Sequence, residues 1–273
     1  MTSSPASVSF DNTEIAFAYK SDKELKQAHW LFSSMQYSLL VNWGTRLTPW
    51  AIRAGMPVKS LIRNTLFKQF VGGETLGETA AVATRLGKWH VQVILDYGVE
   101  GGDNGEEGYN HACDEFLRVI DYAGTQPNIP FMSVKMTGLA RFSLLEKLDQ
   151  SVQENAGPLM KRYASALERL TDDEKAEWQR VYGRIEKICG KAVQKNVGVF
   201  IDAEETWIQD PVDVLCFLMM EKFNREKALV FNTYQLYRTD RLPFLHDSLE
   251  AAQQKGFILG AKLVRGAYME KER

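Results

Sequence analysis

The sequence predicts an α/β fold, a (β/α)8 TIM-type barrel that is incomplete and carries an N-terminal helical arm. After residue 90, short apolar runs alternate with long amphipathic segments, which is typical of parallel strands joined by helices. Polar residues follow these runs at their carboxyl ends, where barrel enzymes place their chemistry. We therefore expect a loose N-terminus over residues 1–22, a helical arm over 23–90 and a partial barrel over 91–273.

The arm is expected to be helical because apolar residues recur every three or four positions between Asp22 and Leu86. Glycine and proline residues between positions 44 and 57 divide it into separate helices. Its tryptophans, Trp30, Trp43 and Trp50, are interpreted as helical core. A hydrophobic lid or a membrane-facing patch is the alternative.

Five runs are expected to form strands: 91–100, 131–137, 197–205, 228–235 and 257–268. Each is continuously apolar over four or more residues, as strands buried on both faces are. No glycine-rich phosphate fingerprint follows any of them, which argues against a dinucleotide-binding sheet. Between the runs, Thr171 and Glu174 form a capping box that opens a long helix, and Gly256 ends another. A closed barrel needs eight strands, so we interpret the chain as truncated.

Composition excludes several classes of function. The 33 basic and 35 acidic residues give a net charge of −2, which offers no electrostatic case for binding nucleic acid. Three scattered cysteines fit a reducing compartment, and the four histidines lack metal-ligand spacing, so no metal is expected. The N-terminus is not a secretory signal, and no apolar run is long enough to span a bilayer. We expect a cytoplasmic protein, with peripheral contact at the inner face of the membrane left open.

Three of the expected strands each carry a charged residue towards one rim of the barrel. Lys135, Asp202 and Lys262 are predicted to share one rim, because the carboxyl ends of parallel strands meet there. A lysine on that rim can stabilise negative charge on a flat cofactor, and the small residues Gly266 and Ala267 let backbone N–H groups approach a ligand. From the residues alone, a purely structural ion-pair network is an equal alternative.

Five motifs, in order, resemble those of proline dehydrogenases. They are LDYGVEGG (95–102) preceded by FVGGETLGE (70–78), SVKMT (133–137), FIDAEE (200–205), FNTYQLY (231–237) and KLVRGAYMEKER (262–273). The resemblance covers roughly residues 65–273. It implies FAD-dependent oxidation of L-proline to 1-pyrroline-5-carboxylate, the first step of proline degradation to glutamate. It also implies hydride transfer to flavin N5 and electron transfer to a membrane quinone.

The resemblance assigns roles to particular residues. Lys135 is implied to lie near the substrate carboxylate, and Asp202 in the active site. Lys262 falls at the N5 and O4 edge of the flavin. Tyr268 is implied to pack over the proline ring, and Glu100 to pair with a substrate-binding arginine and gate the pocket.

The cofactor-binding residues that the resemblance implies are Ala203, Asn232, Lys262, Val264, Gly266, Ala267 and Tyr268. Asn232 stands where relatives often have glutamine, so its amide reaches less far by one methylene. The family's two adjacent arginines, which clamp the proline carboxylate, and strands six to eight have no counterpart in the sequence. We therefore expect this chain to bind FAD poorly and proline hardly at all, unless the missing part is supplied.

Two other functions stay open. One is another flavin barrel oxidoreductase, similar to methylenetetrahydrofolate reductase, which would oxidise NAD(P)H and ignore proline analogues. The other is a non-catalytic truncated remnant that binds partners through its unpaired barrel edges.

Overall fold

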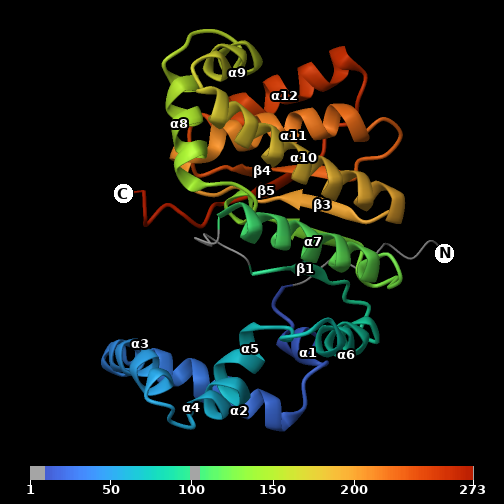
Figure 1. Cartoon of the computed structure of the whole chain (residues 1–273). Helices are drawn as coiled ribbons and strands as arrows, with labels where there is room; N and C mark the ends of the chain where they lie inside the picture. The colour runs from blue at the N-terminus through green and yellow to red at the C-terminus, as the bar shows by residue number, and fades with distance from the viewer. Residues whose placement is uncertain (1–9, 99–104, 273) are drawn as a thin grey trace, which may run out of the picture. The chain divides into compact units, whose positions relative to one another are not determined.

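The computed structural model describes residues 10–98 and 105–272. They belong to two compact units, Met1–Val91 and Gln92–Arg273. The first unit is built from helices and the second contains the sheet (Figure 1). This division separates the helical arm from the strands that were expected to form a barrel.

The first unit contains α1 (Thr13–Phe17), α2 (Asp22–Met35), α3 (Ser38–Arg53), α4 (Val58–Ile62), the π-helical turn η1 (Arg63–Phe67), α5 (Lys68–Phe70) and α6 (Leu76–Gly87). Ser21 and Glu24 form a capping box at the start of α2. The Thr75 hydroxyl accepts the Glu78 N–H at the start of α6. The first unit is therefore helical, and α1 lies inside the segment expected to be loose. Trp30, Trp43 and Trp50 were interpreted as helical core, but they are 64%, 63% and 61% exposed. Throughout the described part of the chain, no helix combines the length and apolar character needed to cross a bilayer.

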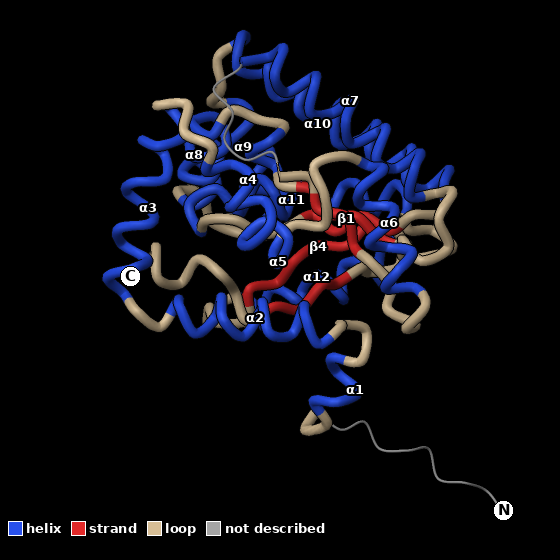
Figure 2. Tube along the Cα trace, turned by 90° about the horizontal axis from the view of Figure 1, so that it is seen from below, coloured by secondary structure: helices blue, strands red, loops and turns tan. Residues whose placement is uncertain are grey.

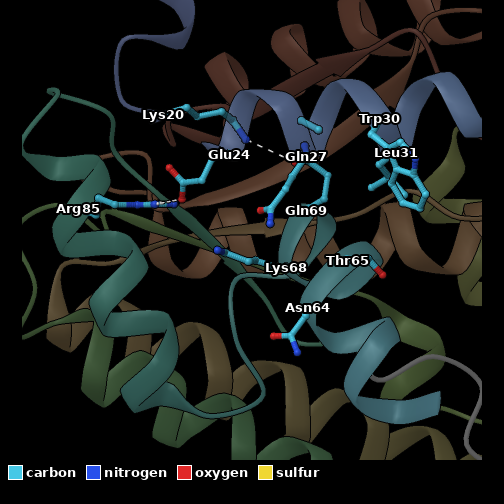
Figure 3. A pocket seen from close by; sticks show the side chains of 11 residues that line it. Lys20, Glu24, Gln27, Trp30, Leu31, Asn64, Thr65, Lys68, Gln69 and Arg85 are labelled. Carbon is cyan, nitrogen blue, oxygen red and sulfur yellow. Dashed lines mark hydrogen bonds and ion pairs between the residues drawn. The ribbon is translucent and has the colours of Figure 1, made fainter. Parts of the chain in front are cut away.

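A cleft lies between α2, η1 and α6 in this unit (Figure 3). Arg85 on α6 holds Glu24 of α2 at 2.6 Å between Nη1 and Oε1. Lys20 donates to Gln69 at 3.4 Å. The Ser21 backbone N–H and the Arg85 guanidinium together lower the pKa of Glu24 to about 2. These contacts join segments that are far apart in the sequence of the arm.

The second unit is organised around one five-stranded sheet. Its strands are β1 (Ile94–Asp96), β2 (Phe131–Val134), β3 (Gly198–Ile201), β4 (Val230–Gln235) and β5 (Ala261–Val264). All neighbours are parallel, and the strand order is β1-β2-β3-β4-β5. Each strand therefore lies beside its predecessor in the chain, as in a barrel, whereas a doubly wound sheet reverses its order part-way.

The helices of this unit are α7 (Gly105–Ala123), α8 (Phe142–Gln153), α9 (Leu159–Glu168), α10 (Asp172–Lys195), α11 (Gln209–Phe223) and α12 (Arg241–Lys255), with 3-10 turns η2 (Met136–Gly138) and η3 (Thr206–Ile208). Thr171 and Glu174 form the predicted capping box of α10. Gly256 adopts the left-handed conformation that ends α12. Figures 1 and 2 show these long helices beside the strands that they connect.

The two faces of the sheet differ in burial. Val134, Val199 and Ile201 point to the face that the helices cover, and they are completely buried. Phe131, Phe200 and Phe231 lie on the opposite face, where their rings contact one another with centroids 4.8 Å and 5.2 Å apart. These three rings stay partly exposed. Helices on one face only are typical of a barrel wall, and we call the phenylalanine side the interior face.

Candidate functional site

An ion pair at the carboxyl end of the sheet joins two of the predicted site residues. Lys262 on β5 places Nζ 2.5 Å from Oδ1 of Asp202, which directly follows β3. The ammonium also lies over the Phe200 ring, 5.3 Å from its centroid, so the pair belongs to the interior face. The Asp202 N–H donates to the Val134 carbonyl at 2.9 Å, which extends the pairing of β3 with β2 as far as this carboxylate.

Lys135, the third predicted charge, follows β2 directly. Its Nζ lies 3.8 Å from Oδ2 of Asp96 at the end of β1. Asp96 is level with Ser133 in the sheet, and Lys135 lies two residues further along, on the same side of the pleat. Strands β1, β2, β3 and β5 thus bring an acid, a lysine, an acid and a lysine to one edge of the sheet. The sequence predicted this shared edge for Lys135, Asp202 and Lys262.

Glu204 was interpreted as a rim or helix charge and was not among the predicted site residues. Its side chain is buried, and its two oxygens accept from the Thr137 backbone N–H at 3.1 Å and the Thr137 hydroxyl at 2.5 Å. Burial raises the pKa of Glu204, against the opposing effect of these hydrogen bonds and of the Lys135 charge. The contact fixes the loop after β3 to the loop after β2, two residues beyond Lys135.

The segment after β5 contains most of the residues expected to line a cofactor. Gly266 has a φ of +108°, and a Cβ added there would clash with the Tyr237 ring. Tyr268 begins a turn, because its carbonyl accepts the N–H groups of Lys271 and Glu272 at 2.9 Å and 3.0 Å. Glu272 ends this turn.

Tyr237 holds this segment in place from the loop after β4. Its N–H donates to the Arg265 carbonyl at 3.1 Å, and its hydroxyl donates to Glu272. Glu272 also accepts the Thr206 N–H at 2.7 Å and the Thr206 hydroxyl. Burial and the neighbouring Glu272 raise the pKa of Tyr237 to about 12, so its phenol stays a donor. The loops after β3, β4 and β5 are therefore joined around one tyrosine and one carboxylate.

Asn232 is not brought to this edge. It lies on the helix-covered face of β4, where its Nδ2 donates to Asp213 of α11 at 2.9 Å. Gln235 lies on the interior face instead, level with Val264 in the sheet. Its Nε2 donates to the Glu204 carbonyl at 3.0 Å, while its buried Oε1 has no partner among the described residues. Spacings of two and four residues put Gln235 on the same face as Thr233 and Phe231, but the sequence does not show which face that is.

The remaining predicted residues are placed as follows. Ala203 is buried beside Asp202. Val264 is partly buried on the interior face of β5, and Ala267 follows Gly266 in the segment that Tyr237 holds. Glu100 lies outside the described residues.

Comparison with known proteins assigns the chain to a family. The sequence model of the family described as proline dehydrogenase matches residues 80–273, which is well over half of the chain. The chain belongs to the proline dehydrogenase family. The matched region contains all five strands and every residue of the site described above.

The relatives of this proline dehydrogenase family member are longer proteins. The mitochondrial proline dehydrogenase 1 of Dictyostelium discoideum is 32% identical over 240 residues, covering 79% of this chain and 42% of the relative. The carbapenem antibiotics biosynthesis protein CarD of Pectobacterium carotovorum is 35% identical over 206 residues, covering 75% and 50% respectively. The chain thus spans about half the length of the curated relatives it matches.

A solved structure shares the fold. Proline utilization A from Bdellovibrio bacteriovorus superposes with a TM-score of 0.61 over 96% of this chain and 27% of that protein, at 16% sequence identity. A second proline utilization A structure gives a TM-score of 0.50 over 73% of the chain and 18% of its own length. The predicted (β/α)8-type barrel architecture is confirmed, with five strands present here.

Proposed function

We propose that this chain forms the β1–β5 part of the active site of an FAD-dependent proline dehydrogenase, which oxidises L-proline to 1-pyrroline-5-carboxylate. The observation that carries the proposal is the Lys262–Asp202 pair on the interior face, at the carboxyl end of the sheet. Membership of the proline dehydrogenase family supports the choice of substrate.

The residues at this edge fit a flavin. A flat aromatic ring system needs an apolar surface along its body and polar groups around its rim. The phenylalanines of the interior face offer the first, while Lys262 and the unpartnered Oε1 of Gln235 offer a cation and an acceptor. The left-handed Gly266 keeps the backbone after β5 free of a side chain at that point. When bound, FAD supplies the acceptor for the hydride that leaves the substrate.

The chain's own residues have separate roles in this proposal. Lys135 binds the substrate carboxylate, since it is the cation at the end of β2. Lys262 stabilises negative charge on the cofactor edge, and Asp202 holds that lysine in place. Tyr268 packs against the proline ring. The substrate amine loses its proton to solvent, so no buried base is required. Electrons then pass to a membrane quinone, as the family resemblance implies.

The test begins with the purified chain and its visible spectrum. The chain alone is expected to bind FAD poorly, so it is compared with a version extended by strands six to eight of a relative. For the extended version, a yellow protein whose flavin spectrum shifts with tetrahydro-2-furoic acid, and which L-proline bleaches without oxygen, is the expected result. Lys222→Met, on the outer surface of α11, serves as the control variant and should behave as the wild type. Bleaching by NADH but not by proline would replace the proposal with another flavin oxidoreductase. An extended protein that stays colourless after incubation with excess FAD would favour the non-catalytic alternative.

A further inference from the structure

Gln209, the first residue of α11, has a buried carboxamide that joins two parts of the second unit. The Glu204 backbone N–H donates to its Oε1 at 3.2 Å, and its Nε2 donates to Oδ1 of Asp213 at 2.9 Å. Gln209 is 2% exposed and Asp213 is 1% exposed, so water has little access to either contact. The helix-covered side of the sheet is thus connected to the loop after β3, at the edge where Lys262 pairs with Asp202.

Asp213 sets the orientation of this carboxamide. A carboxylate accepts hydrogen bonds and does not donate them, so Gln209 presents its NH2 group to Asp213 and its oxygen to the Glu204 N–H. Asp213 is itself held by Arg241, at 2.7 Å between Nη1 and Oδ2. Asn232 is a further donor, with its Nδ2 at 2.9 Å from Oδ1. Three donors thus converge on this buried carboxylate, which leaves it the role of acceptor.

Glu204 transmits this orientation to the interior face. Its side chain is fixed by Thr137, so its backbone has little freedom to rotate. Its carbonyl accepts Nε2 of Gln235 at 3.0 Å, and because a carbonyl is also only an acceptor, the Gln235 oxygen points away from it. That Oε1 is buried and has no partner among the described residues. A buried acceptor without a donor is a position that a donor on a bound ligand can fill.

We propose that Gln209 and Asp213 are positioning residues of the active site. Through the Glu204 backbone they hold the Gln235 carboxamide in the orientation that offers its oxygen to a donor on the ligand, such as the ring N–H of a flavin. The inference rests on the flavin site proposed above, and it adds to that site two residues that need not contact the ligand. Loss of Gln209 frees the Gln235 carboxamide to turn, and an NH2 group that faces a ligand N–H is unfavourable.

A purely structural role of Gln209 predicts a different pattern. In that case its hydrogen bonds stabilise α11 against the loop after β3, and replacing it lowers the free energy of unfolding. The orientation of the Gln235 carboxamide then stays the same, and any loss of ligand affinity does not depend on which residue stands at position 235. Direct observation of Gln235, and a comparison of single and double variants, therefore separate the two roles.

The first test requires no cofactor. NMR spectra of the chain with isotopically labelled glutamine report the Gln235 carboxamide, whose signal is identified by its loss in Gln235→Leu. We expect this NH2 group to exchange its hydrogens with water about five-fold faster in Gln209→Met than in the wild type, the factor that loss of one neutral hydrogen bond gives. Gln209→Glu should restore slow exchange, because a protonated carboxyl group beside Asp213 has the donor and acceptor of a carboxamide. An unchanged exchange rate in Gln209→Met would overturn the proposal.

The second test is a double-mutant cycle on FAD affinity, measured by equilibrium dialysis with the chain extended by strands six to eight of a relative. Gln209→Met should weaken FAD binding by about five- to ten-fold when Gln235 is present. In the Gln235→Leu background it should weaken binding by less than about two-fold, because no carboxamide is left to orient. Equal weakening in both backgrounds would overturn the proposal. If no variant bound FAD, the flavin site proposed above would fail, and the exchange of Gln235 would still decide whether Gln209 orients it.

Gln153→Met is the matched control. Gln153 of α8 donates to Asp149, one turn away, at 2.6 Å, and this pair repeats the Gln209–Asp213 arrangement in another helix. Its replacement should change neither the exchange of the Gln235 carboxamide nor the affinity for FAD. If Gln209→Met did not fold, Gln209→Asn would take its place, because it keeps a carboxamide whose reach is shorter by one methylene. The same faster exchange of Gln235 is expected for that variant.

Discussion

Lys262 on β5 reaches past β4 to Asp202 at the end of β3, with 2.5 Å between Nζ and Oδ1. The two side chains are 30% and 16% exposed, so the pair is partly shielded from water but still accessible to a ligand. A lysine whose ammonium pairs with a carboxylate two strands away is held more firmly than a lysine anchored only by its own strand. This geometry leads to the first prediction.

Lys262→Met should lower the rate of flavin reduction by proline by about a hundred-fold or more, because loss of one preorganised electrostatic contact costs that much in other enzymes. Lys262→Arg keeps the charge and should retain most of the rate. The measurement is anaerobic rapid mixing of L-proline with the FAD-bound protein, extended by strands six to eight of a relative. Lys222→Met is the matched control on the outer surface of the second unit. A Lys262→Met protein that reduces flavin at the wild-type rate would remove Lys262 from the proposed site.

Thr137→Val should destabilise the protein by about 1–3 kcal/mol, because it leaves an oxygen of the buried Glu204 without its hydroxyl donor. Urea unfolding followed by circular dichroism measures the change. The control is Thr125→Val, whose exposed hydroxyl donates to the Tyr122 carbonyl in a turn after α7. That substitution should change the free energy of unfolding by less than about 0.5 kcal/mol. Equal effects at the two sites would argue against a clamp between the loops after β2 and β3.

Gly266→Ala should loosen the segment after β5, since Gly266 has a φ of +108° and an added Cβ would meet the Tyr237 ring. We expect faster amide hydrogen exchange over residues 266–272 and weaker FAD binding. Gly183→Ala is the matched control, because Gly183 lies inside α10 with nothing within 4 Å of the added Cβ. That variant should be neutral or stabilised by up to about 1 kcal/mol. Unchanged exchange in Gly266→Ala would show that the contact with Tyr237 does not hold the segment.

Asp149→Asn should remove part of the pH dependence of stability. Asp149 of α8 is buried, and its carboxylate accepts the Asp210 N–H at 2.8 Å and Gln153 Nε2 at 2.6 Å. Burial, with the nearby charges of Asp210 and Asp213, raises its pKa to about 7. An unfolded aspartate titrates near pH ~3.9.

Between those two values the folded protein holds one proton more than the unfolded chain, so stability falls as pH rises through this window. We expect the wild type to lose on the order of 2–4 kcal/mol from this group between about pH 4 and pH 8, and Asp149→Asn to lose correspondingly less. Urea midpoints across that range provide the measurement. Asp173→Asn, at an exposed position near the start of α10, should keep the wild-type slope. A variant slope equal to that of the wild type would mean that Asp149 does not take up this proton.

Much of the site could be anticipated from strand ends alone. Lys135 and Asp202 directly follow β2 and β3, and Lys262 lies within β5, level with Thr233 of β4. Parallel strands gather their carboxyl ends at one edge whatever the details of packing. It was harder to predict to which side of the sheet each side chain of a strand points. Because β4 is buried on both sides, its apolar pattern does not show which of Asn232 and Gln235 points to the interior face. Only the pairing of β4 with β3 and β5 decides this.

The sequence by itself determined the order of five parallel strands, the helices between them and the charges at their ends, because periodicity, caps and strand termini are local properties. Tertiary structure alone decided that Glu204 holds Thr137, that Tyr237 holds Gly266 and Glu272, and that Trp43 and Trp50 stay exposed on α3. These contacts join residues from about 30 to 67 positions apart, or depend on which side of a helix finds a partner. Only the folded chain sets those distances and exposures.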